Sequence, residues 1–187
     1  MLLAVDTSTR SVGIALYDGT SVLGEMSWYS HNYHTVELAP SVQALFNRCG
    51  IQPGQLTVIA AALGPGSFTG LRIGLALVKG MAQGQNLPVI GIPTLDFLAA
   101  AQPPSDLPLA AVLQAGRGRL ALGWYHYKNE HWQQQEGLSI TTAEELAASI
   151  TKPTLVCGER DAEEQKTLTR KYRNVILASP AHSARRP

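Results

Sequence analysis

The chain has 187 residues, of which 45% are hydrophobic and 16% charged, and its net charge is +1. This composition predicts an ordered core, in one compact domain or two small lobes, and excludes a disordered protein. The near-neutral charge gives no general reason to expect a nucleic-acid or membrane binder. Two cysteines, Cys49 and Cys157, are too few for a disulfide framework and lack metal-ligand spacing.

The N-terminal segment MLLAVDTSTR is apolar for only a few residues before it reaches Asp6. We therefore expect no signal peptide, and no apolar run is long enough to span a bilayer. A cytoplasmic protein is expected.

The first half of the chain predicts three strands followed by alternating helices and strands. Asp18–Gly19 indicates a hairpin, Thr35 and Thr94 are the expected helix N-caps, and Gly50 is the expected C-cap. The predicted elements are strands over 2–6, 11–18 and 21–28, a helix over 34–50, a strand over 56–63, a helix over 69–84, a strand over 87–92 and a short helix over 94–101.

A proline-rich break, QPPSDLP at 102–108, precedes a second series of the same kind. Strands are predicted over 109–115 and 119–128, and Thr142 with Glu145 predicts a capping box before another helix. Strands over 154–159 and 174–178 flank a charged helix over 161–172. The order predicts an α/β protein built from duplicated βββαβα lobes, 1–101 and 102–187, rather than a doubly wound βαβ fold.

The segment GPGSFTG, at 64–70, lies between a strand and a helix and suggests a phosphate-binding loop. It fails the spacing of both the Walker loop and the dinucleotide fingerprint, since Thr69 occupies the position where each requires glycine. No Asp or Glu occurs between Glu37 and Asp96, so nearby sequence supplies no carboxylate for Mg²⁺. Nucleotide or anion binding without chemistry stays an alternative. The loop supplies the candidates Gly66 and Ser67, and the resemblance described below adds Asp6, Thr7 and Ser8 after the first strand.

The helix after this loop carries Gly70 and Gly74 on one face. Glycine inside a helix costs roughly 1 kcal/mol relative to alanine, so the pair needs a reason. Close packing inside the molecule and a docking face for a partner are the two explanations, and the residues alone favour close packing.

The strand LLAVDTST, the long motif GPGSFTGLRIG, the pattern HT…L.P at 34–40 and IGI.TL at 90–95 together resemble the bacterial TsaB (YeaZ) family. The resemblance covers residues 1 to about 101 and implies an actin-like, ribonuclease H-like fold of the actin/Hsp70/sugar-kinase superfamily, with a reduced second lobe. It also implies a non-catalytic subunit for threonylcarbamoyladenosine (t6A) modification of tRNA at A37, which pairs with TsaD and with itself, recruits TsaE and meets tRNA only through the complex. No cofactor is required by the chain, although ATP or ADP is compatible with the complex interface, and no membrane contact is implied.

Proteins of this family pair through two helices, which correspond here to about 35–49 and 69–83. The resemblance therefore favours a docking role for Gly70 and Gly74 more than the residues alone do. The interface residues predicted on this basis are His34, Leu38, Val42, Leu45, Gly70, Leu71, Gly74, Leu75 and Val78.

An enzyme, either a small actin-fold ATPase or a metallopeptidase, is the alternative function. It would use Asp6, the loop and the pair His31 and His34. Asp6 is better explained as a strand-end turn residue, and two histidines without a third ligand do not make a metal site. Gln114 stands where ATPases of this fold carry Asp, and an amide has no charge with which to hold Mg²⁺. We therefore expect no catalytic and no metal-binding residue.

Overall fold

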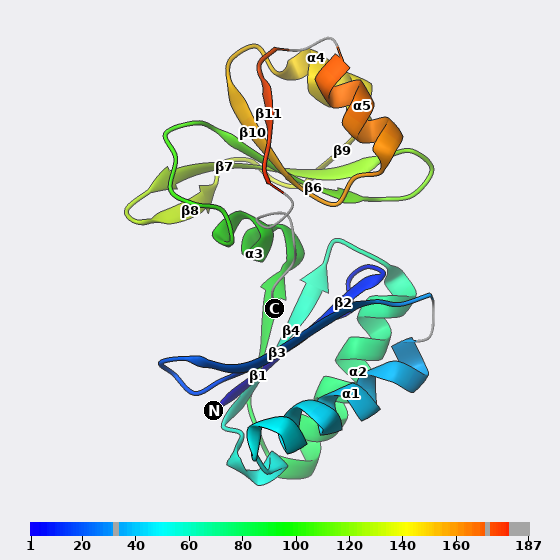
Figure 1. The fold of residues 1–187 in the computed structure, drawn as a ribbon, viewed down its shortest axis with the longest axis vertical. Helices are drawn as coiled ribbons and strands as arrows, with labels where there is room; N and C mark the ends of the chain where they lie inside the picture. Colours follow the sequence, from blue (N-terminus) through cyan, green and yellow to red (C-terminus); the bar gives the residue numbers. More distant parts are fainter. Residues whose placement is uncertain (32–33, 171–172, 180–187) are drawn as a thin grey trace. The chain divides into compact units, whose positions relative to one another are not determined.

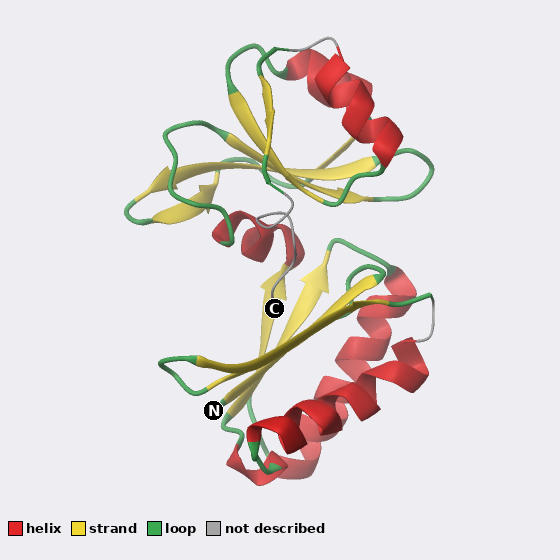
Figure 2. Ribbon diagram, viewed as in Figure 1, coloured by secondary structure: helices red, strands yellow, loops and turns green. Residues whose placement is uncertain are grey.

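The computed structural model describes residues 1–31, 34–170 and 173–179, which form two compact units. The first unit comprises Met1–Thr94 and the second begins at Leu95. Each unit is a mixed β-sheet with helices packed on it (Figure 2). No described helix combines the length and the apolarity that crossing a membrane requires.

The first unit is a five-stranded sheet with the strand order β3-β2-β1-β4-β5. Its helices α1 and α2 lie side by side on one face of this sheet (Figure 1). The elements are β1 (Leu2–Asp6), β2 (Ser11–Tyr17), β3 (Val22–Tyr29), α1 (His34–Cys49), the short 3-10 helix η1 (Pro53–Gln55), β4 (Val58–Gly64), α2 (Phe68–Gln85) and β5 (Val89–Pro93).

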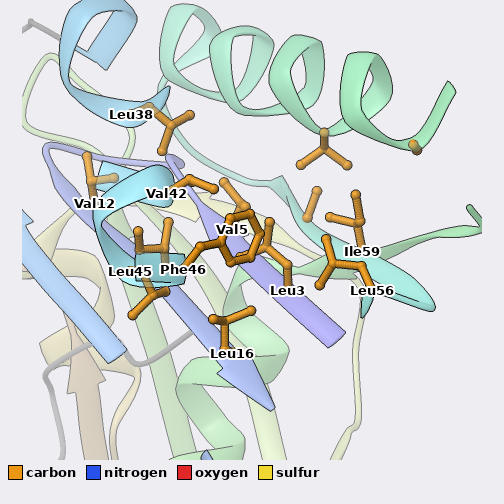
Figure 3. Close-up of a cluster of buried hydrophobic side chains, with 14 residues drawn as sticks. Leu3, Val5, Val12, Leu16, Leu38, Val42, Leu45, Phe46, Leu56 and Ile59 are labelled. Atoms are coloured by element: carbon orange, nitrogen blue, oxygen red, sulfur yellow. The ribbon is translucent and has the colours of Figure 1, made fainter. Parts of the chain in front are cut away.

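The core of the first unit forms where α1 and α2 press apolar side chains onto the sheet. Leu38, Val42, Leu45 and Phe46 of α1 recur at helical spacing and are almost fully buried (Figure 3). They meet alternate residues of β1, β2 and β4, because every second side chain of a strand points to the same face. Those strand residues are Leu3, Val5, Ile14, Leu16 and Ile59.

The second unit is a six-stranded sheet with helices on both faces. The strand order is β11-β10-β6-β7-β8, and β9 also pairs with β7. Helices α4 and α5 cover one face and α3 covers the other. The elements are α3 (Thr94–Ala100), β6 (Leu109–Gln114), β7 (Leu120–Lys128), β8 (His131–Gln134), β9 (Ser139–Thr141), α4 (Ala143–Ser149), β10 (Thr154–Gly158), α5 (Ala162–Arg170) and β11 (Val175–Leu177).

The two sheets confirm the predicted duplication. β6, β7, β8, β10 and β11 follow the connections of β1 to β5, and in each unit the first strand is central, antiparallel to the second and parallel to the fourth. The α/β class and the actin-like order of elements are therefore as expected. The strands β8 and β9 were not predicted separately.

The boundary between the units lies earlier than the sequence suggested. The break was predicted at 102–108, but helix α3 packs with the second unit. Leu95 and Leu98 are buried against β6 and β7, and the Tyr125 hydroxyl donates to Asp96 Oδ1 at 2.7 Å. Burial and this hydrogen bond raise the pKa of Tyr125.

Most of the predicted turn and cap residues act as expected. The β2–β3 turn spans four residues, with Gly19 at φ 105° and Asp18 Oδ1 accepting from the amides of Thr20 and Ser21. Gly50 ends α1 in the left-handed region, at φ 67°. Thr142 and Glu145 form the capping box of α4.

The predictions for Thr35 and Thr94 are wrong. α1 already begins at His34, so Thr35 lies inside the first turn. Thr94 is the first residue of α3, and its buried hydroxyl makes no hydrogen bond.

The two cysteines should differ sharply in reactivity. Burial raises the pKa of the Cys157 thiol to about 12, whereas Cys49 is partly exposed at the end of α1. With a disulfide reagent at about pH 8, we expect one fast thiol in the native protein and two after denaturation, because the thiolate is the reacting form. The Cys49→Ser variant should lose the fast reaction, and a fast thiol in that native variant would contradict the assignment.

Candidate functional site

The segment that follows β1 is held against the loop that precedes α2. The Ser67 amide donates to the Ser8 carbonyl oxygen, and the Thr7 hydroxyl donates to the Gly70 carbonyl oxygen at 2.8 Å. Ser67 also caps α2, because its side-chain oxygen accepts from the Gly70 amide. The motif GPGSFTG therefore fastens α2 to the central strand of its own sheet.

Glycine is required at three positions by this close approach. A Cβ atom on Gly66 would collide with the Ser8 carbonyl oxygen. One on Gly70 would meet the Thr7 carbonyl oxygen, and one on Gly74 would meet the Thr7 hydroxyl oxygen. The glycines thus serve contact between a helix and a strand within one unit.

The five predicted anion-contact residues do come together at this junction. Asp6, Thr7 and Ser8 are at most 2% exposed, whereas Gly66 and Ser67 are exposed. The Ser8 amide donates to Asp6 Oδ1 at 2.8 Å, which confirms a turn role for Asp6. Folding also brings the Asp6 carboxylate to this junction, although the stretch of sequence that contains the loop has no carboxylate of its own. Anion binding here stays a prediction.

The corresponding turn of the second unit is filled by the chain's own acids. Gln114 Nε2 donates to Glu164 Oε2 at 3.2 Å. Asp161 and Glu164 cap α5 reciprocally, each accepting from the other's amide. Carboxylates at a helix N-terminus neutralise the dipole that would otherwise attract a phosphate. The polar groups of this turn therefore bond with one another at the start of α5.

His31 and His34 each contact neighbouring groups of the first unit. His34 is 6% exposed, and its Nε2 lies 3.1 Å from the Thr9 carbonyl oxygen, so it packs at the start of α1 as expected. His31 is exposed and makes an edge contact with the Tyr29 ring. Within the described ranges, no three His, Cys, Asp or Glu side chains gather where they could hold a metal.

The predicted interface residues need correction, because most of them face inward. Buried side chains belong to the unit's own core and are not available to a partner on its surface. Leu71 and Leu75 alone of the predicted set are partly exposed. The buried residues are His34, Leu38, Val42, Leu45, Gly70, Gly74 and Val78.

Helix α2 has a second small-residue stripe on its opposite side. Ala76, Gly80 and Gly84 are exposed, and we call them the outward stripe. They follow the buried positions 74, 78 and 82 by two residues, which is about 200° around a helix. A Cβ added at Gly80 or Gly84 would have nothing within 4 Å. Neither close packing nor backbone conformation within the unit therefore explains these two glycines.

Sequence reasoning missed the outward stripe although its spacing is the same. The signal was the polar character of the neighbours Lys79 and Gln83, which marks the solvent side of α2. The inward glycines attracted attention because they lie inside the longer motif.

The comparisons with known proteins agree with this architecture. The family model described as "TsaD: tRNA N6-adenosine threonylcarbamoyltransferase" matches residues 28–173. The tRNA threonylcarbamoyladenosine biosynthesis protein TsaB of Bacillus subtilis (strain 168) is 34% identical over 160 residues, which cover 84% of this chain and 70% of that protein. The chain belongs to the TsaB family.

Other relatives match a smaller part of this TsaB-family chain. TsaB of Escherichia coli (strain K12) is 36% identical over 98 residues, which is 52% of this chain and 42% of that protein. The match therefore spans less than half the length of that relative. The solved structure of YeaZ from Pseudomonas aeruginosa superposes with a TM-score of 0.78 at 23% identity, over 94% of this chain and 83% of that one, and shows the shared fold.

A matched pair of substitutions tests the two sides of α2 in this TsaB-family chain. Gly74→Ala should lower the free energy of unfolding by about 1–3 kcal/mol, because the new methyl group meets Thr7. Gly80→Ala should raise it by up to about 1 kcal/mol, because alanine is the better helix former and the site has room. Urea unfolding of the two variants measures both changes; equal effects would show that the stripes are assigned to the wrong sides.

Proposed function

We propose that this chain is a non-catalytic subunit for t6A modification of tRNA at A37, and that it pairs with a TsaD-family transferase through the outward face of α2. The names of the relatives support the pathway. The match to the TsaD model supports the choice of partner, since two chains of one fold can pair through equivalent faces. The same face would support a homodimer, and TsaE would join the paired complex.

The observation that carries the proposal is the unused space at Gly80 and Gly84. Two glycines lower the stability of a helix by roughly 2 kcal/mol relative to two alanines, and the unit itself gains no contact from them. Small side chains on an exposed helix face let a second helix approach its backbone closely. A partner helix seated on Ala76, Gly80 and Gly84 would recover this cost.

Helix α1 would extend the same surface. It lies beside α2 (Figure 1), and its exposed side carries Val36, Ala39 and Pro40. Val36 is 66% exposed, so a partner that covered it would gain favourable free energy from apolar burial. In this corrected interface the core residues of α1 hold the helix in place while its solvent side makes the contact.

The chain needs no nucleotide of its own in this role. Gln114, Asp161 and Glu164 bond with one another at the second-unit turn. The residues after β1 bond with the loop before α2 and with the start of that helix. Any ATP or ADP would bind at the surface shared with the transferase.

An enzymatic function is the second candidate, because the matching family model describes a transferase. Its carboxylate would be Asp6, which is 2% exposed and already accepts from the Ser8 amide. Hydrolysis of ATP or of a peptide by the purified chain, abolished in Asp6→Ala, would favour the enzyme and overturn the partner role.

Replacing both outward glycines tests the interface. Gly80→Leu with Gly84→Leu should weaken pairing with the TsaD-family partner at least 10-fold, because the added side chains hold the helices apart. Size-exclusion chromatography of the mixed chains, with a pull-down at several concentrations, measures the change. Circular dichroism should show a folded variant, since leucine is a good helix former.

Gly137→Leu is the matched control for this experiment. It adds the same side chain where a Cβ also has nothing within 4 Å, but in the second unit. Wild-type pairing by the double glycine variant would refute the proposed face, and equal weakening by Gly137→Leu would show that the effect is not specific to α2.

A further inference from the structure

Helix α2 carries two exposed cations beside the outward stripe, Arg72 and Lys79. Measured from Ala76, their side chains are turned about 40° and 60° to one side of the helix. Gly80 and Gly84 are turned about 40° and 80° to the other side. The solvent side of α2 therefore has one positively charged flank and one flank of small residues.

An aromatic ring holds Arg72 in place on this flank. The guanidinium carbon lies 4.1 Å from the centre of the Phe68 ring, which is a cation–π contact on the surface. A guanidinium stacked on a ring keeps the N–H groups of its edge available, and it loses less side-chain freedom when a carboxylate binds. Arg72 is therefore positioned to pair with an anionic group that approaches α2 from solvent.

Within the described part of the first unit, neither cation is paired with a carboxylate. The four carboxylates of this unit are Asp6, Asp18, Glu25 and Glu37. Asp6 is buried, Asp18 lies in the β2–β3 turn and Glu25 lies within β3. Glu37 is partly exposed, but it accepts from the Trp28 indole of β3. It therefore lies on the side of α1 away from α2, because α1 packs over β2 and β3 whereas α2 packs over β1, β4 and β5.

A second copy of the chain on this face would bring like charges together. An antiparallel pair of α2 helices that are in contact from Phe68 to Gly84 has Ala76 on its two-fold axis. Position 72 of one helix then faces position 80 of the other. Arg72 consequently lies within one residue of Lys79 of the second copy, on the same flank, and the symmetry repeats this contact. Like charges that face each other across an interface oppose association.

We propose that the outward face of α2 selects an acidic partner helix over a second copy of this chain, through Arg72 and Lys79. This inference rests on the pairing proposed above and adds the chemistry of the partner. The two cations are about 10 Å apart along the helix axis, so the facing helix of the transferase should carry Asp or Glu at two positions that are two turns apart. Opposite charges at these positions favour the mixed pair over the homodimer.

Charge reversals test the homodimer. Lys79→Glu should strengthen self-association about 5- to 30-fold, because two repulsive contacts become attractive. Arg72→Glu with Lys79→Glu should return the chain to weak self-association, since like charges face each other again, but this double variant should associate with the wild-type chain. Sedimentation velocity over a concentration series measures the dissociation constants. Both positions are exposed and glutamate is a good helix former, so circular dichroism should show folded variants.

The mixed pair should respond in the opposite direction. Lys79→Glu should weaken pairing with the TsaD-family transferase about 10-fold, because it places carboxylates face to face. Raising the salt concentration from about 50 to about 500 mM should weaken the wild-type mixed pair and strengthen the wild-type homodimer, because screening reduces attraction and repulsion alike. Isothermal titration calorimetry measures the mixed pair. Replacing the facing acidic residue of the transferase with lysine should restore pairing with the Lys79→Glu chain.

Lys166→Glu is the matched control. It makes the same change of charge at an exposed position of a helix, but in α5 of the second unit. Both kinds of pairing should change by less than about 2-fold, because an isolated surface charge contributes little.

Unchanged mixed pairing of the Lys79→Glu chain, or self-association that this variant does not strengthen, would overturn the selection by charge and leave the pairing role intact. Equal effects of Lys166→Glu would also overturn it, since net charge alone would then explain the result. A wild-type chain that forms no complex with the transferase would contradict the proposed function itself, and the acidic partner with it.

Discussion

The first unit depends on the close approach of α2 to the chain that follows β1. Thr7 and Ser8 lie so near to Gly66, Gly70 and Gly74 that no Cβ atom fits at these three positions. This contact sets the distance between the start of α2 and the sheet. It therefore also positions Val78 and Ala82 in the core. It also determines which side of α2 faces solvent. A single steric constraint thus positions both the core and the proposed interface.

The second unit has a similar close contact between a glycine and its central strand, but the start of its following helix is capped by carboxylates. Gly158, at the end of β10, lies so near the central strand β6 that a Cβ atom would meet the Val112 carbonyl oxygen. Beyond it, Asp161 and Glu164 close the start of α5 with their own carboxylates, and the Gln114 amide joins them. Two copies of one topology have therefore diverged at the turn where function usually resides in α/β folds. In the first unit the carboxylate of that turn, Asp6, is buried. In the second unit Asp161 and Glu164 accept hydrogen bonds from backbone amides of the chain itself.

The fold could be read from the sequence because its signals are local and periodic. The hairpin at Asp18–Gly19, the capping box at Thr142 and the helical spacing of Leu38, Val42 and Leu45 each predict one element, and their order predicts the duplication. The interface residues could not be read in the same way. Gly70–Gly74 and Gly80–Gly84 have the same spacing, and only the tertiary contact with Thr7 shows which pair is buried. The proximity of Asp6 to a loop about 60 residues away is likewise a product of strand pairing.

The outward glycines also affect how the protein behaves when it is alone. Gly80 and Gly84 lie in the last third of α2, where the polar neighbours Lys79 and Gln83 add no burial and an Asn86 cap ends the helix. Backbone amides there should open locally more often than those near Thr7, at a free energy below that of global unfolding. A bound partner would suppress these openings by ordering the helix end. Association of this chain would then be coupled to the completion of its own secondary structure, and amide hydrogen exchange in this segment would report on the assembly state.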